Sequence, residues 1–112
     1  MISTHILDTA RGRPAAGVPV LLERVAEGGA AREVTRAVTD ADGRVRELAP
    51  TGGSLAAGDY RLTFDSGAYF AAQGVEGFYP LVTVLFTLRD PTQHHHVPLL
   101  LSPFGYATYR GS

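Results

Sequence analysis

The chain has 112 residues, of which 45% are hydrophobic and 19% charged, a length and composition that suit one globular domain with one core. A net charge of −1 gives it no electrostatic preference for nucleic acid or for an anionic membrane, so neither is expected as a partner. The absence of cysteine excludes disulfides and cysteine-bound metals, and 13 glycines with 7 prolines leave little room for long helices.

Apolar and polar residues alternate with a period of two in short segments of the first half, which predicts strands. One of these segments contains Pro19, which has no N–H to donate. Its strand is therefore predicted at a sheet edge, or with the proline nitrogen pointing outward. The predicted strands are Thr4–Asp8, Val18–Arg24 and Arg32–Val38, separated by a turn-rich stretch at Arg11–Pro14 and a loop at Ala26–Ala31.

The middle of the chain is rich in turn residues. The run from Asp40 to Gly43 resembles the beginning of a calcium-binding loop but lacks the later oxygen ligands and the closing glutamate. A tight turn over Thr39–Gly43 is the simpler interpretation. After it come a brief extended segment, a glycine-rich loop and a strand, predicted at Arg44–Leu48, Pro50–Gly58 and Asp59–Phe64.

The second half predicts one short helix and then three strands. Ser66 is expected to cap a helix over Ser66–Gly74, and Gly74 is expected to end it. With no internal repeat and no linker, residues 1–112 are predicted to form a single domain, an all-β sandwich of two sheets. The three strands are predicted at Leu81–Leu88, His94–Leu101 and Tyr106–Tyr109.

Histidine is the most informative residue type in the sequence. Side-chain alternation along a strand puts His94 and His96 on one face and His95 on the other. Such a pair can be two ordinary surface histidines, two ligands of a metal ion or two groups that transfer a proton. No aspartate or glutamate stands near it at the spacing of a metal ligand, which argues against a dedicated metal site. Arg44 follows the turn and is expected at a fixed strand end. Its planar guanidinium would either be solvated or bind a carbonyl or carboxylate group.

The two ends of the chain carry further expectations. No apolar run is long enough to cross a bilayer, and the first residues lack the basic and apolar regions of a signal peptide. A cytoplasmic protein without a membrane partner is therefore expected. By residue chemistry alone, the tail Tyr109–Ser112 is expected to fray.

Three stretches of the sequence together resemble the transthyretin-like protein family. The similarity runs from about residue 3 to residue 112. Within that family, a tail reading Tyr-Arg-Gly-Ser is typical of the 5-hydroxyisourate hydrolases and not of the hormone carriers. His95, Phe104 and Ala107 are mild departures from the family pattern. The matching stretches are Ser3–Thr9 with Gly12–Ala15, then Thr39–Arg44, and finally His94–Ser112.

The resemblance implies a sandwich of two four-stranded antiparallel sheets with one short helix. It also implies a homotetramer, a dimer of dimers in which subunits pair through their final strands and active sites lie in a channel between the dimers. The catalytic positions would be His5, Arg44 and His96. The substrate would be held by an ordered tail, Tyr109, Arg110, Gly111 and Ser112.

The implied reaction is the hydrolysis of 5-hydroxyisourate in urate degradation, without a metal or an organic cofactor. Water would attack a ring amide with help from histidine, and Arg44 would stabilise the oxyanion. His96 is the preferred base and His5 the orienting group or the leaving-group acid, but the sequence leaves that assignment open. Two alternatives also stay open: a small-ligand carrier of the same fold, and a structural or metal-binding sandwich that uses His94 and His96.

Overall fold

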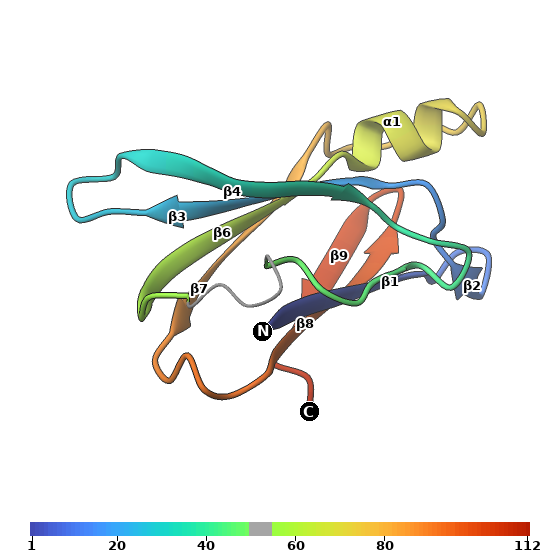
Figure 1. Cartoon of the computed structure of the whole chain (residues 1–112). Coiled ribbons are helices and arrows are strands. Elements are labelled where there is room, and N and C mark those ends of the chain that lie inside the picture. Colours follow the sequence, from blue (N-terminus) through green and yellow to red (C-terminus); the bar gives the residue numbers. More distant parts are fainter. Residues whose placement is uncertain (50–54) are drawn as a thin grey trace.

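The computed structural model describes residues 1–49 and 55–112, which form two β-sheets packed face to face (Figure 1). One sheet has the strand order β2-β1-β8-β9, with β5 also paired to β1, and the other has the order β4-β3-β6-β7. The strands are β1 (Ile2–Asp8), β2 (Arg13–Pro14), β3 (Pro19–Val25), β4 (Ala31–Val38), β5 (Arg44–Val45), β6 (Gly58–Phe64), β7 (Val82–Leu88), β8 (His95–Ser102) and β9 (Gly105–Thr108).

The predicted two-sheet sandwich with one short helix is confirmed, with two differences in the first sheet. The stretch predicted as a turn at Arg11–Pro14 contains β2, which makes this sheet five-stranded. The pairing of β1 with β8 is parallel, whereas an antiparallel sheet was expected. No hairpin joins these two strands, since almost the whole chain lies between them, so their relative direction is free of that constraint.

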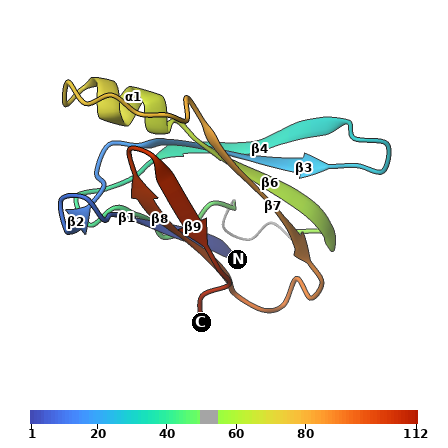
Figure 2. The ribbon, with the colours of Figure 1, turned by 180° about the vertical axis from the view of Figure 1, so that it is seen from behind.

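The prediction of an edge strand at Pro19 is wrong, because β3 lies between β4 and β6 (Figure 2). Pro19 is the first residue of the strand, a position where a sheet tolerates proline. Its carbonyl still accepts a hydrogen bond from the Asp65 N–H at 2.9 Å. Proline has no N–H to return this bond to the Asp65 carbonyl, which instead accepts from the Tyr69 N–H at 3.3 Å.

The helix is shorter than expected and has a different cap. Helix α1 (Ser66–Ala71) begins after Asp65, whose Oδ1 accepts a hydrogen bond from the Ala68 N–H at 3.0 Å. The hydroxyl of Ser66, the predicted cap, donates instead to the Tyr79 carbonyl at 3.1 Å. Gly74, with a φ of +68°, lies three residues past the end of the helix. In the described part of the chain, no helix is long and apolar enough to cross a membrane.

The turn between β4 and β5 is confirmed and fixes the start of β5. Asp40 Oδ1 accepts hydrogen bonds from the N–H groups of Asp42 and Arg44, both at 2.9 Å. Gly43 has a φ of +72°, and a Cβ there would lie 2.5 Å from the Ile6 carbonyl oxygen, so only glycine fits. The extended segment predicted after the turn is only two residues long. Residues 50–54 of the loop predicted at Pro50–Gly58 lie outside the described residues.

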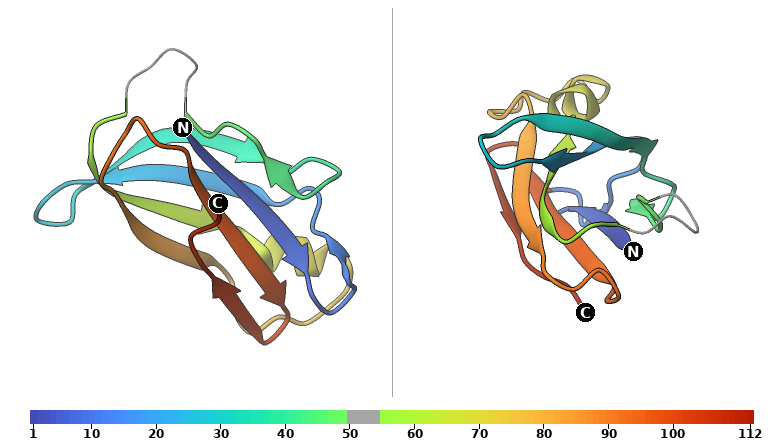
Figure 3. Two further views of the ribbon diagram at one scale, coloured as in Figure 1. Left: turned by 90° about the horizontal axis from the view of Figure 1, so that it is seen from below. Right: turned by 60° about the vertical axis from the view of Figure 1, so that its left-hand side comes forward.

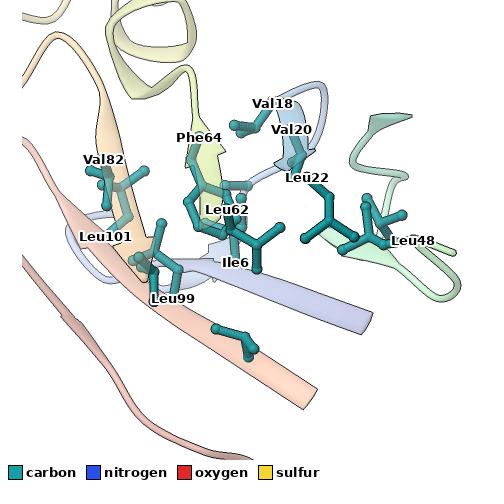
Figure 4. Close-up of a cluster of buried hydrophobic side chains, with 14 of the residues drawn as sticks. Ile6, Val18, Val20, Leu22, Leu48, Leu62, Phe64, Val82, Leu99 and Leu101 are labelled. Carbon is teal, nitrogen blue, oxygen red and sulfur yellow. The ribbon is translucent and has the colours of Figure 1, made fainter. Parts of the chain in front are cut away.

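The hydrophobic core lies between the two sheets (Figure 4). Tyr60, Leu62 and Phe64 share the inner face of β6, as their spacing predicts, and each is at most 2% exposed. On β8 the inner face carries His95, Val97, Leu99 and Leu101, which leaves His94 and His96 on the outside. The alternation that fills the core therefore also presents a polar outer face.

A buried carboxylate ties the end of β1 to the helix. Asp8 is 1% exposed and accepts hydrogen bonds from the Tyr69 hydroxyl at 2.7 Å and from the Arg11 N–H at 3.1 Å. Burial, and then this contact with Asp8, raise the pKa of Tyr69. The buried carboxylate therefore has a structural role.

Removal of the Tyr69 hydroxyl is expected to destabilise the fold. Tyr69→Phe leaves the buried Asp8 with one donor fewer, at a cost of about 1.5–3 kcal/mol in the free energy of unfolding. Tyr60→Phe is the matched control, because the Tyr60 hydroxyl donates at 2.7 Å to a neutral carbonyl, that of Ala56, with an expected cost near 1 kcal/mol. Urea unfolding measures both, and a Tyr69→Phe loss no larger than that of Tyr60→Phe would contradict this account.

Candidate active site

The candidate site lies on the outer face of the sheet that contains β1, β8 and β9, which run side by side in the left view of Figure 3. Two pairings of β1 assemble it. The antiparallel pairing with β5 sets His5 opposite Arg44, and the parallel pairing with β8 sets Ser3 opposite His96. Residues directly opposite one another on paired strands point to the same face, so the three sequence-predicted residues come together.

A cavity of about 190 Å³ opens on this face. Every residue that lines it has a polar side chain, and these include two guanidinium groups but no carboxylate. His5 stands beside the cavity and does not line it. The lining residues are Ser3, Thr4, Arg44, Arg46, His94, His96 and Ser112.

A larger cavity of about 510 Å³ lies on the other side of His96. It is bounded by β7, by the segment 89–93 and by β9, and Tyr109 and Arg110 line it. The tail residues are thus divided, because Ser112 lines the small polar cavity while Tyr109 and Arg110 line the large one. His96 lines both, which makes it the meeting point of the two spaces.

The tail is docked on β8, as the resemblance implied and residue chemistry alone did not. The Gly111 N–H donates to the His96 carbonyl at 2.8 Å, and the Arg110 guanidinium donates to Gln93 Oε1 at 3.2 Å. A Cβ on Gly111 would lie 2.6 Å from Cδ2 of the His96 ring. Only glycine lets the tail lie this close to the imidazole.

Ser3 and His94 also lie in the site, although neither was among the predicted catalytic or substrate-binding residues. The Ser3 hydroxyl lies 2.7 Å from His94 Nε2 and 2.8 Å from His96 Nδ1. The available signal was the position of Ser3 two residues before His5, which puts both on one face of the strand. Arg46 was also missed, since nothing in its spacing distinguishes it from a solvated arginine.

Burial and the nearby cation keep both imidazoles neutral. The pKa of His96 is lowered by burial, then by Arg44, and further by His94 and His5. The pKa of His5 is lowered by burial and then by Arg44, partly offset by the backbone of Asp42 and by the charges of Asp40 and Asp42. At neutral pH each ring therefore has a nitrogen lone pair with which to accept a proton.

The metal alternative for His94 and His96 depends on additional ligands. Within residues 1–49 and 55–112, no group of three or more histidine, aspartate or glutamate side chains is arranged to hold a metal ion. The group between the two imidazoles is instead the Ser3 hydroxyl. The arrangement provides a neutral imidazole, a guanidinium and a hydroxyl around one small cavity, a set of groups suited to proton transfer and oxyanion stabilisation.

A sandwich with this strand order and this polar outer face is that of a transthyretin-like protein. The family model described as HIUase/Transthyretin matches residues 2–111, and the chain belongs to that family. A curated relative from Halalkalibacterium halodurans, named 5-hydroxyisourate hydrolase, is 48% identical over 99% of this chain and 97% of its own length.

Two solved structures are also similar. The 5-hydroxyisourate hydrolase of Klebsiella pneumoniae has a TM-score of 0.84 and 40% identity, covering 99% of this chain and 92% of that one. Sea bream transthyretin in complex with thyroxine has a TM-score of 0.90 and 33% identity, covering 98% and 93%. The resemblance seen in the sequence is confirmed.

Histidine titration tests the electrostatics of the site. We expect the ring protons of His5 and His96 to titrate, by NMR, with midpoints below 6.5, the ordinary value for histidine. Arg44→Gln removes a positive charge that disfavours the imidazolium form, so both midpoints rise. Arg46→Gln is the control, because the Arg46 guanidinium is paired with Asp42 at 3.5 Å, and it leaves the midpoints in place. A fall in either midpoint on Arg44→Gln would refute the role of Arg44.

Proposed function

We propose that the chain catalyses the hydrolysis of 5-hydroxyisourate to 2-oxo-4-hydroxy-4-carboxy-5-ureidoimidazoline, a step of urate degradation. The observation that carries the proposal is the convergence of Arg44, His96 and Ser112 on one small cavity. Full-length relatives named 5-hydroxyisourate hydrolase support the choice of substrate. The chain is accordingly an enzyme, a cyclic amide hydrolase.

Opening the ring makes three chemical demands. A water molecule must lose a proton as its oxygen bonds to the ring carbonyl carbon, the carbonyl oxygen must carry negative charge, and the ring nitrogen must gain a proton as the C–N bond breaks. A neutral imidazole suits the first demand near pH 7. His96 is the base in this proposal, because it lines the cavity and its pKa is lowered.

Arg44 answers the demand for oxyanion stabilisation. Its backbone is fixed at the start of β5 by the turn that precedes it, and its guanidinium is planar and permanently charged. A fixed cation stabilises developing charge without reorganising during the reaction. It also suits the flat, oxygen-rich substrate, whose other polar edges would meet the Ser112 hydroxyl.

His5 is proposed as the group that orients the substrate or protonates the leaving nitrogen. It stands opposite Arg44 and contributes to lowering the pKa of His96. Tyr109, Arg110 and Gly111 are proposed as substrate-binding residues that narrow the approach past His96. The reaction as written needs no metal and no organic cofactor.

The homotetramer and the cytoplasmic location belong to the same proposal. In the described chain β7 and β9 each end a sheet, so each has an edge free to pair with another copy. The exposed side chains of Leu85 on β7 and Tyr106 on β9 support association along these edges. In such an assembly the large cavity beside His96 would lie next to a subunit contact.

Decay of freshly made 5-hydroxyisourate, followed by ultraviolet absorbance, tests the activity. We expect the wild type to accelerate the decay, Arg44→Gln to lose about 10²–10³ of the rate and His96→Ala about 10²–10⁴. His95→Tyr is the matched control from the same triplet, because His95 points to the inner face of the sheet, and it keeps the activity. No acceleration by the wild type would refute the function, and equal rates for wild type and His96→Ala would refute the role of His96.

A small-ligand carrier is the second candidate, favoured by the likeness to a transthyretin solved with thyroxine. The docked tail opposes it, because Tyr109 and Arg110 line the large cavity that an aromatic ligand would enter. We expect calorimetry to detect no tight binding of thyroxine to the wild type. Tight binding without any hydrolysis of 5-hydroxyisourate would favour the carrier.

A further inference from the structure

The Ser3 hydroxyl lies between two imidazoles, and its hydrogen-bonding capacity constrains both. Ser3 is 5% exposed, so water has little access to it, and its oxygen lies within 2.8 Å of one nitrogen from each ring. A hydroxyl has one hydrogen to donate and two lone pairs that accept. Ser3 can therefore donate to only one of the two rings and must accept an N–H from the other.

This count leaves two arrangements when both rings are neutral. In the first, the Nδ1–H of His96 donates to Ser3 and Ser3 donates to His94 Nε2, so His96 Nε2 carries a lone pair. In the second, Ser3 donates to His96 Nδ1 and accepts from the Nε2–H of His94, so His96 Nε2 carries the hydrogen. Only the first arrangement makes Nε2 a base.

The packing of the His96 ring determines which nitrogen can reach a substrate. Nδ1 is engaged by Ser3, and the Cδ2 edge lies against the backbone of Gly111. The remaining edge, with Cε1 and Nε2, belongs to a ring that lines the small cavity together with Arg44 and Ser112. A base at this position therefore has to act through Nε2.

We propose that Ser3 and His94 are positioning residues that hold His96 in the tautomer with hydrogen on Nδ1, which leaves Nε2 as the base. The inference deepens the proposed function and relies on it. When Nε2 takes a proton from water, Ser3 goes on accepting from Nδ1–H and donating to His94, so no group has to turn. The proton then leaves Nε2 for the departing nitrogen, directly or through water, and the ring returns to its starting tautomer.

The chain offers a matched pair of variants at His94, whose side chain is exposed and whose replacement does not disturb the core. His94→Leu removes the acceptor for the Ser3 hydrogen. His94→Gln restores one, since the glutamine amide ends near the position of the histidine Nε2 and its oxygen accepts. Ser102→Ala is a serine control on β8, the strand of His96, because the Ser102 hydroxyl donates to the Gly105 carbonyl at 2.9 Å, away from the imidazoles.

Kinetics and nitrogen NMR together test the proposal. We expect Ser3→Ala and His94→Leu to lower kcat about 10–100-fold, a typical effect of removing an orienting partner, with KM changed less than kcat. His94→Gln recovers most of the loss, and Ser102→Ala shows none. Equal kcat for wild type and His94→Leu, or no recovery in His94→Gln, would overturn the positioning role.

The ¹⁵N–¹H correlation pattern of His96 reports its tautomer without any substrate. We expect hydrogen on Nδ1 in the wild type and a shift toward hydrogen on Nε2 in Ser3→Ala, in a protein whose circular dichroism is unchanged. Hydrogen on Nε2 in the wild type would overturn this inference even if the enzyme is active. An inactive wild type with the expected tautomer would overturn the proposed function and leave the assigned tautomer standing.

Discussion

The parallel pairing of β1 with β8 fixes both the core and the polar site. Its register runs from Ile2 opposite His95 to Asp8 opposite Leu101. Side chains alternate along each strand, so the register that buries Ile6 and Leu99 also turns His96 outward. A slip of one residue would send apolar groups to solvent and imidazoles to the core. The free energy of core burial therefore also holds the site together.

Other segments dock on this strand pair through backbone hydrogen bonds. The Ile6 N–H donates to the Gly43 carbonyl at 2.8 Å, next to Arg44, and the Gly111 N–H donates to the His96 carbonyl at the same distance. The backbone beside Arg44 and the backbone of the tail are thus held against the strand pair by main-chain hydrogen bonds. Burial, and then the charge of Arg44, lower the pKa of His5 and His96, and a neutral imidazole is the form that accepts a proton.

The fold by itself does not separate a hydrolase from a carrier. A structure named as a hydrolase and one named as a transthyretin with thyroxine both match this chain with TM-scores above 0.8. Function therefore has to be argued from the side chains of the site. Here the small cavity on one side of His96 is polar and cationic, while the larger one is lined by Tyr109 and Arg110.

The longer strands, the turn at Thr39–Gly43 and the shared face of His94 and His96 could be predicted from the sequence, because each follows from neighbouring residues and side-chain alternation. The catalytic roles of His5 and Arg44 were assigned only through a family resemblance. The central position of Pro19 and the bridging hydroxyl of Ser3 were missed. Ser3 and His96 are 93 residues apart, and local patterns do not reveal which distant strands pair or in which direction. The pairing and direction of distant strands are decided only in the folded chain, because they depend on the burial of all the core residues together.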